Sequence, residues 1–209
     1  MTARFVYAFD PLCGWCYGFG PALRAVRAAL PDLAIELRFG GLVTGGSIGP
    51  YIDKRAYIEA AQVRLRAATG LAPGPNFHAR ILQDPSVIAS SIPPCDVLLQ
   101  LRSVVPGAVP DFAEAIQTAH FRDGADFNDP GLYARIAGEM GLDFYPDVPR
   151  PDELRPELAA EFATTAGMGV SSYPTLFLRS DAGLRPITLD YAPAGQLAAV
   201  QAALAASAR

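Results

Sequence analysis

The first forty residues change from a strand pattern to a helix pattern and back again. Residues 5–9 (FVYAF) are a short aromatic and β-branched run, which predicts a buried strand. Apolar side chains then recur at spacings of three and four across residues 19–30, which predicts a helix that ends at Pro31. Residues 34–39 (AIELRF) alternate apolar and polar side chains and predict a second strand.

The middle of the chain is patterned as helices. Residues 40–50 (GGLVTGGSIGP) are rich in glycine and predict a flexible connection. Helical spacing then continues for about a hundred residues, in segments bounded by Pro, Gly, Asp or Asn. Asn128-Asp129-Pro130 is typical of a helix start. Residues 143–151 hold three prolines and predict a linker.

The C-terminal part returns to a mixed pattern. Residues 154–162 predict one more helix, which ends before the glycines of residues 167–169. Short strands are expected at residues 175–178 and 186–189, joined by a turn over residues 181–183. An amphipathic helix over residues 197–204 closes the chain. The order strand, helix, strand, long helical segment, helix, strand, strand, helix predicts an α/β fold with a large helical insertion.

Composition narrows the function classes. The chain has 209 residues, 51% of them hydrophobic and 18% charged, which excludes a disordered or fibrous protein. A net charge of −4 argues against a nucleic-acid partner. No apolar stretch approaches the length of a membrane span, and the apolar run at residues 5–9 is too short for a signal peptide. We therefore expect no membrane partner and a cytoplasmic location; the oligomeric state is left open.

The chemistry is concentrated in Cys13-Gly14-Trp15-Cys16. This CxxC motif follows a predicted strand and opens a predicted helix, which is the setting of a redox pair. Two cysteines three apart on a first helical turn lie close enough to form a disulfide. Cys13 would face the positive end of the helix, which favours the nucleophilic thiolate, whereas Cys16 would be more shielded. Since zinc requires about four ligands and the other soft donors show no ligand spacing, we expect no metal site.

Three further groups carry weaker signals. Cys95 is expected as a buried small hydrophobe, with a third redox thiol as the alternative. His78 and His120 have no paired nucleophile and are expected at the surface or half-buried on helices. The glycines of residues 41–46 have the spacing of a phosphate-binding loop, but the lysine is missing before Ser47, which favours a hinge.

Three segments resemble a known family. They are FDPLCGWCYGF, FNDPGLYARIAGEMGLD and GMGVSSYPTLFL. Together with the element order, they resemble the DsbA-like branch of the thioredoxin superfamily, near the cytoplasmic protein-disulfide isomerases and FrnE-like proteins. The resemblance implies a thioredoxin-like domain over residues 1–45 and 150–209, interrupted by an inserted helical domain over residues 46–149.

The same resemblance implies roles for individual residues. Cys13 would attack and Cys16 would resolve the mixed disulfide, with Gly14 in contact with the substrate. Trp15, inside the motif, is expected to lie exposed beside Cys13 and to contact the substrate, with ordinary packing on the helix as the alternative. Pro174 would be a cis-proline, and the backbone of Tyr173 would pair with an extended substrate chain.

Two positions depart from the family pattern. The buried acid that often lies six residues before the first cysteine is replaced by Tyr7. Asp10 is then either the proton acceptor for Cys16 or a turn residue before Pro11, and both interpretations stay open. The dipeptide Gly14-Trp15 also lacks the histidine of strongly oxidising members.

The function predicted is thiol-disulfide exchange on protein or small disulfides, as a reductase or isomerase, because the cytosol keeps thiols reduced. No cofactor is expected beyond the cysteine pair, with glutathione as a candidate reductant. Two alternatives remain. One is a glutathione-dependent isomerase or transferase similar to the hydroxychromene-carboxylate isomerase and kappa-type transferase group, in which the attacking group is usually a serine. The other is a redox-silent binding module.

Overall fold

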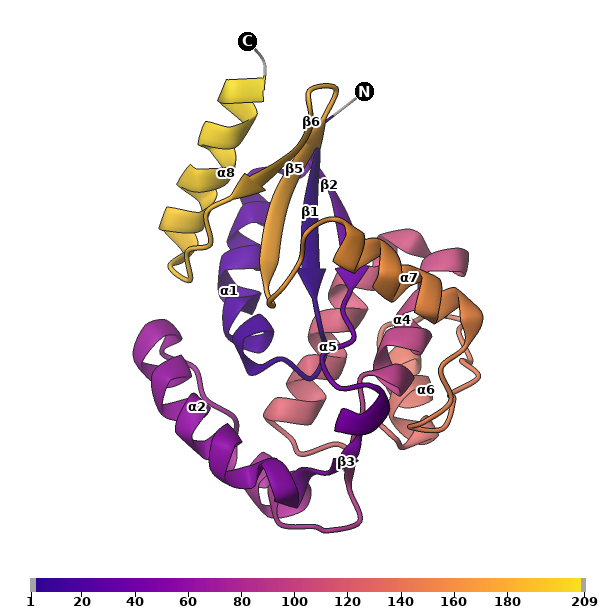
Figure 1. Cartoon of the computed structure of the whole chain (residues 1–209). Coiled ribbons are helices and arrows are strands. Elements are labelled where there is room, and N and C mark those ends of the chain that lie inside the picture. Colours follow the sequence, from indigo (N-terminus) through magenta and orange to yellow (C-terminus); the bar gives the residue numbers. More distant parts are fainter. Residues whose placement is uncertain (1–2, 208–209) are drawn as a thin grey trace.

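A computed structural model describes residues 3–207 of the chain (Figure 1). The central sheet has four strands, β1 (Arg4–Phe9), β2 (Ala34–Phe39), β5 (Thr175–Ser180) and β6 (Gly183–Ile187), in the order β2-β1-β5-β6. Strand β1 pairs in parallel with β2 and antiparallel with β5, and β5 pairs antiparallel with β6. Strand β1 is therefore central, and its carboxyl end leads directly to the CxxC motif.

Helices cover both faces of this sheet. Helix α1 (Gly14–Ala29) packs beside α8 (Pro193–Ser207) on one face, and α7 (Pro156–Gly167) lies on the other (Figure 1). The strands at residues 5–9 and 34–39 and the helix after the CxxC motif are confirmed. Because the apolar positions of α1 are buried at helical spacing, they anchor the helix that carries both cysteines against the sheet.

The segment between β2 and α7 is mainly helical, as expected. It contains α2 (Arg55–Thr69), α3 (Pro75–Phe77), α4 (Ile92–Val104), α5 (Val109–Phe121) and α6 (Pro130–Glu139), with short helical turns at Gly45–Ser47, Tyr51–Lys54, His78–Leu82 and Pro106–Ala108. It also holds a two-stranded sheet, β3 (Gly49–Pro50) and β4 (Ile88–Ala89), which the sequence pattern missed because two residues are too few to show alternation. Residues 143–151 are irregular, as predicted.

Two boundaries in the C-terminal part were wrong. Strand β6 spans Gly183–Ile187 instead of residues 186–189, because Ser180 pairs with Gly183 across a two-residue turn. Gly183 has a φ of 104°, a conformation that L side chains avoid. Helix α7 begins at Pro156 instead of residue 154, since proline suits the first turn of a helix.

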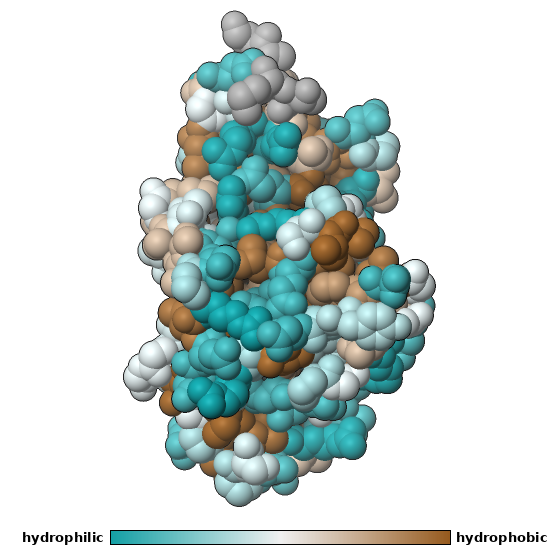
Figure 2. All heavy atoms as spheres, turned by 90° about the vertical axis from the view of Figure 1, so that its right-hand side faces the viewer, coloured by the Kyte–Doolittle hydropathy of each residue, from teal (hydrophilic) through white to brown (hydrophobic). Residues whose placement is uncertain are grey.

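A continuous apolar core joins the sheet to the helical segment. Phe5 and Phe9 of β1 belong to the same buried cluster as Ile92 and Phe112 from the segment 46–149. Because the two parts share one core, they pack as a unit, and the division into domains at residues 45 and 150 stays a prediction. Among residues 3–207, no helix is long and apolar enough to cross a membrane. The face in Figure 2 is largely hydrophilic, with apolar patches between polar side chains.

A second buried cluster lies within the inserted segment, and the His120 ring packs against its members Tyr51 and Phe77. The expectation of a surface or half-buried His120 was wrong, because the side chain is fully buried. Its Nδ1 is 2.8 Å from the carbonyl oxygen of Ala125, its Nε2 is 3.1 Å from the hydroxyl of Tyr51, and its ring stacks on Phe127. Burial lowers the pKa of His120 to about 4, so the ring is neutral at physiological pH.

Candidate active site

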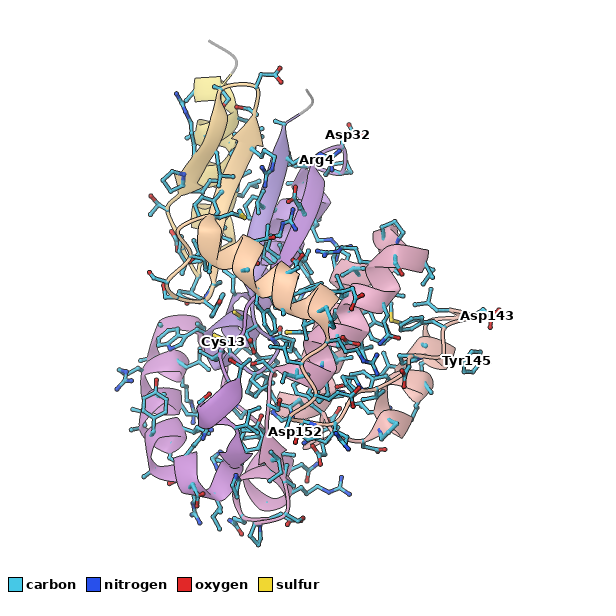
Figure 3. The ribbon with its side chains drawn as sticks, turned by 45° about the vertical axis from the view of Figure 1, so that its right-hand side comes forward. Arg4, Cys13, Asp32, Asp143, Tyr145 and Asp152 are labelled. Carbon is cyan, nitrogen blue, oxygen red and sulfur yellow. The ribbon has the colours of Figure 1, made fainter. Side chains whose placement is uncertain are left out.

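The two cysteines of the motif lie where β1 gives way to α1. Cys13 is the residue immediately before the helix, and its backbone N–H donates to the carbonyl of Asp10 at 3.0 Å. Its sulfur therefore stands at the amino end of α1, where the helix dipole favours an anion. Figure 3 places Cys13 between the end of the sheet and α2.

Cys16 lies one turn into the helix and is 1% exposed, compared with 6% for Cys13. Both residues are free thiols. Burial, followed by the interaction with the neighbouring Cys13 thiol, raises the pKa of Cys16 well above its ordinary value. Cys13 is thus the more accessible thiol and Cys16 the more shielded one, and their roles as the attacking and the resolving sulfur stay a prediction.

Tyr173 and Pro174 meet the motif from the other end of the chain. The Sγ of Cys13 donates to the carbonyl oxygen of Tyr173 at 3.4 Å, and the Tyr173–Pro174 peptide bond is cis, as the resemblance implied. The backbone of Tyr173 therefore lies beside the sulfur that a substrate would approach. Its role in docking a substrate chain remains a prediction.

Asp10 is buried in the turn that precedes the CxxC motif. The side chain is fully buried and accepts from the backbone N–H groups of Leu12 and Leu42, each at 2.9 Å. Asp10 thus forms the turn before the motif and ties it to the glycine-rich connection. Burial raises the pKa of Asp10 to about 6, although these hydrogen bonds oppose the shift. The proton-acceptor role toward Cys16 stays a prediction.

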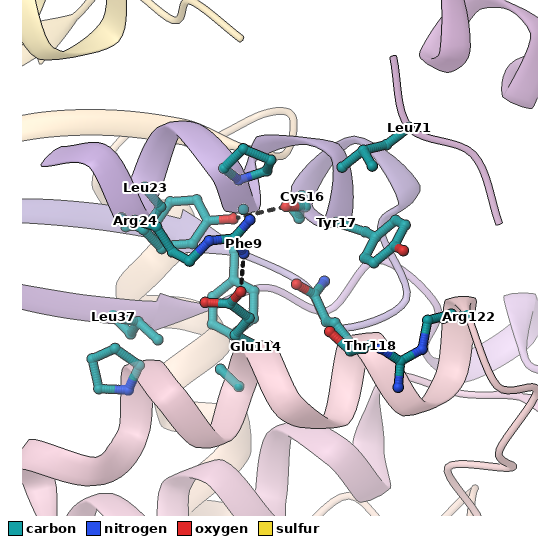
Figure 4. Close-up of a pocket in the computed structure, with 16 residues that line it drawn as sticks. Phe9, Cys16, Tyr17, Leu23, Arg24, Leu37, Leu71, Glu114, Thr118 and Arg122 are labelled. Carbon is teal, nitrogen blue, oxygen red and sulfur yellow. Dashed lines mark hydrogen bonds and ion pairs between the residues drawn. The ribbon is translucent and has the colours of Figure 1, made fainter. Parts of the chain in front are cut away.

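Tyr7 occupies the place of the family's buried acid and contacts the backbone of Cys16. Its hydroxyl lies 3.5 Å from the Cys16 carbonyl oxygen, and burial raises its pKa well above the ordinary value. Both residues line a cavity of about 170 Å³ between α1 and α5, where Arg24 pairs with Glu114 (Figure 4). A neutral phenol therefore stands behind Cys16, at the position where the resemblance led us to expect a buried acid.

A separate groove of about 320 Å³ opens at Cys13. Its walls come from the CxxC loop with Gly14 and Trp15, from one face of α2, and from the segment ending at Tyr173. Trp15 is half-buried, and its ring centroid lies 5.4 Å from that of Tyr191. The expectation that Trp15 lies exposed beside Cys13 was therefore wrong. This groove and the cavity behind Cys16 share no lining residue.

Sequence reasoning missed two features: the groove wall on α2, and Gly40, where a Cβ would lie 2.0 Å from the Tyr173 ring. The helical spacing of Ile58, Ala61 and Leu65 was visible, but it indicated only an apolar face and not what the face lines. Gly40 gives no local signal beyond following a strand. Cys95 is fully buried, as expected, and its thiol donates to the Gly40 carbonyl at 3.4 Å.

The chain matches no known protein family profile and no curated protein sequence. Among solved structures, it is similar to the cytosolic disulfide reductase DsbM from Pseudomonas aeruginosa, with a TM-score of 0.80, 25% identity, and coverage of 97% of this chain and 99% of that one. A structure of the same DsbM with GSH has a TM-score of 0.74 and 23% identity over 97% and 99% of the two chains. A candidate protein disulfide isomerase from Nitrosomonas europaea has a TM-score of 0.80 and 24% identity over 99% of each chain.

These structures share with this chain the α/β thioredoxin-like fold with a helical insertion. Their similarity extends over almost the full length of each chain, and in this chain the fold brings a CxxC pair and a cis-proline together. The chain therefore has the α/β thioredoxin-like fold with a helical insertion that is seen in DsbA-like structures.

Proposed function

We propose that this protein is a thiol-disulfide oxidoreductase that reduces or isomerises protein disulfides. One observation carries the proposal: Cys13 and Cys16 are free thiols at the first turn of α1, and the Tyr173 carbonyl oxygen lies 3.4 Å from the Cys13 sulfur. A nucleophile, a resolving thiol and a backbone edge for an extended chain thus meet within one site.

The exchange takes place in two balanced steps. The Cys13 thiolate attacks one sulfur of the substrate disulfide, which forms a mixed disulfide and releases the other sulfur as a thiolate. Cys16 then loses its proton and attacks the Cys13 sulfur, which closes the Cys13–Cys16 disulfide and releases the second substrate thiolate. Two electrons pass to the substrate, so an external thiol must reduce the pair before the next cycle.

We favour the reducing or isomerising direction in the cytoplasm. DsbM is described as a cytosolic disulfide reductase and has been solved with GSH, which supports glutathione as the thiol that restores the pair. The dipeptide Gly14-Trp15 has no histidine to stabilise a Cys13 thiolate further. Both points favour a reductase or isomerase over a strong oxidase.

The test is reduction of insulin disulfides with glutathione as the electron donor. Wild type and Cys95→Ala are expected to be active, and Cys13→Ser is expected to lose activity because the nucleophile is gone. Cys16→Ser is expected to accumulate mixed disulfides, since nothing resolves them. Wild-type rates in Cys13→Ser would overturn the proposal, and glutathione-dependent isomerisation surviving in that variant would favour the isomerase or transferase alternative.

A further inference from the structure

The resolving step of the proposed function needs the Cys16 sulfur as an anion in a place that disfavours one. Cys16 is buried, and burial raises the pKa of its thiol well above the ordinary value. Only the thiolate attacks a disulfide, so the protein must stabilise this anion for the step to proceed. The neighbours of Cys16 therefore decide how fast the mixed disulfide is resolved.

Tyr7 of β1 places a hydroxyl beside Cys16. Its ring is buried, stacks on Phe9 at a centroid distance of 5.2 Å and packs on Phe19 at 5.4 Å, so the side chain is held in one position. The hydroxyl donates to the Cys16 carbonyl oxygen at 3.5 Å, which is a long hydrogen bond. Because a phenol can turn its single proton, a stronger acceptor on the same residue would receive it instead.

The Tyr7 hydroxyl also faces the two sulfurs of the motif. Burial is the largest cause of its raised pKa, followed by the charges of Cys16 and Cys13 and the interaction with the Cys16 side chain. Each of these favours the neutral phenol. Tyr7 therefore keeps its proton next to an ionised Cys16, whereas a carboxylate in its place would add a second negative charge.

Several ionisable groups face Cys16 from the elements packed around it. Besides burial, the Cys13 thiol and the charge of Asp10 raise its pKa, while the backbone of Asp10 lowers it. Burial raises the pKa of Tyr173 and of Tyr191, which also face Cys16, so both phenols stay neutral. The charged groups at the cavity behind Cys16 form two ion pairs, Arg24–Glu114 and Arg122–Asp123. Stabilisation of the thiolate therefore comes from neutral donors, and among the phenols of residues 3–207 only Tyr7 hydrogen-bonds to Cys16.

The cavity of about 170 Å³ gives the released proton a way out. Tyr7 and Cys16 line its inner end, and the exposed residues Arg24 and Arg122 line it at the surface (Figure 4). This volume admits water, which can carry a proton to the solvent. The polar side chains of α5 that would bind such water are Glu114, Gln117 and Thr118.

We propose that the Tyr7 hydroxyl turns its hydrogen bond from the Cys16 carbonyl to the Cys16 sulfur as this sulfur ionises, and so stabilises the thiolate that resolves the mixed disulfide. The Cys16 proton passes to water in the cavity, and Tyr7 keeps its own. The Cys16 sulfur then bonds to the Cys13 sulfur, and the bond from Cys13 to the substrate sulfur breaks as the substrate thiolate leaves. This inference rests on the proposed function, in which Cys16 is the resolving thiol.

The experiment separates attack from resolution with 2,2′-dithiodipyridine. All proteins carry Cys95→Ala, so that only the two thiols of the motif react. Cys13 attacks the probe and releases one 2-thiopyridone, in a phase whose rate grows with probe concentration. Cys16 then attacks the Cys13 sulfur and releases the second 2-thiopyridone, in a phase that does not depend on probe concentration. Stopped-flow absorbance follows both phases from about pH 6 to about pH 10.5, a range that extends well above the ordinary pKa of a thiol.

Tyr7→Phe removes only the hydroxyl and is expected to leave the first phase unchanged. Losing one hydrogen bond to a charged group should raise the pKa of Cys16 by about 1–2 units. Because a more basic thiolate is also a better nucleophile, about half of this effect is offset, and the second phase should slow about three- to tenfold at neutral pH. The two profiles should converge at high pH, where Cys16 is ionised in both proteins.

Tyr17→Phe is the matched control, because Tyr17 lines the same cavity from α1. Burial raises the pKa of Tyr17, and the charges that act on it belong to arginine and aspartate side chains and to neither cysteine. Both phases of Tyr17→Phe should therefore match those of the parent at every pH.

The outcomes separate the two proposals. An unchanged second phase in Tyr7→Phe would overturn the inference and leave the proposed function intact. A second phase slowed equally at every pH would also overturn it, since Tyr7 would then only position Cys16, and so would a slowed first phase, since the hydroxyl would then act on Cys13. Equal slowing in Tyr17→Phe would show that any hydroxyl of the cavity has the same effect, against the inference. A parent protein that lacks either phase would instead refute the proposed function.

Discussion

The ring of Tyr173 occupies the space that a side chain at residue 40 would need. A Cβ on Gly40 would lie 2.0 Å from the Cζ atom and 2.4 Å from the hydroxyl oxygen of Tyr173. Gly40 follows β2 directly, and its N–H donates to the Phe9 carbonyl at 2.8 Å, so its backbone is held in place by the central strand. The absence of a side chain at residue 40 thus lets Tyr173 bring its carbonyl to Cys13.

Gly40→Ala is therefore expected to disturb the active site, although residue 40 takes no part in the reaction itself. The added methyl group must push the Tyr173 ring away, which should cost about 1–3 kcal/mol of unfolding free energy. The displaced Tyr173 carbonyl should reduce kcat/KM for insulin reduction about tenfold. Urea unfolding and turnover measurements check the two effects.

Gly46→Ala is the matched control in the same connection. A Cβ at Gly46 would meet nothing within 4 Å, so stability and turnover should stay near wild type. Replacing the ring as well, in Gly40→Ala with Tyr173→Ala, should recover part of the lost stability because the clash is gone. A fully stable and active Gly40→Ala protein would contradict the packing argument.

Asp10 should make the folded state less stable as pH rises. Its folded-state pKa of about 6 lies above the ordinary value of 3.8, so the folded state holds this proton more tightly than the unfolded chain. The stabilisation is complete below the unfolded pKa and is lost as pH rises through about 6. Relative to Asp10→Asn, the wild-type unfolding free energy is expected to fall by about 2–3 kcal/mol between about pH 4 and pH 7. Denaturant unfolding of both proteins across this range checks the difference, and a constant difference would show that Asp10 titrates normally.

His120 should make the folded state less stable as pH falls. Burial lowers its pKa from 6.5 to about 4, so the folded state disfavours the imidazolium. Its contribution is fully present above about pH 6.5 and is lost as pH falls toward 4. The imidazole resonances of His120 are expected to remain in the neutral form at pH 5.5, with assignment by comparison with His120→Gln. Titration near the ordinary value would show that the ring reaches solvent.

Glu161 should hold three elements together through its carboxylate. From α7 it accepts from Arg102 of α4 at 2.7 Å and from Arg38 of β2 at 3.1 Å. Burial opposes ionisation, but the hydrogen bonds and charge of Arg102 and the charge of Arg38 prevail and lower the pKa of Glu161. The stabilisation is therefore present above the ordinary pKa of 4.5 and is lost as pH falls below it.

Glu161→Gln is expected to lower the unfolding free energy by about 2 kcal/mol at neutral pH, between the worth of a surface pair and a buried one. Glu139→Gln breaks the exposed pair with Arg135 on α6 and should change stability little. Denaturant unfolding at neutral pH compares the two variants, and an equal effect of both would mean that the Arg102–Glu161–Arg38 network adds nothing beyond an ordinary surface contact.

The helix and strands around the CxxC motif could be predicted from short stretches of sequence. A buried strand, a helical repeat and two cysteines three apart each involve neighbours within a few residues, whose spacing is set by backbone geometry. The resemblance then supplied the thioredoxin-like fold and the cis peptide bond before Pro174, both of which the structure contains. Very short strands and the ends of helices were misplaced because pairing partners and prolines shift such boundaries locally.

The arrangement around the sulfur depends on contacts that no local pattern contains. Tyr173 reaches Cys13 across 160 positions of chain, and Gly40 matters only because that ring packs on it. Asp10 is a buried turn residue because the glycine-rich connection folds back over it, and Leu65 of α2 lines the groove because Gly18 leaves room for its side chain. Such relations arise when distant segments close-pack around one core, so shape and burial settle them after the local elements have formed.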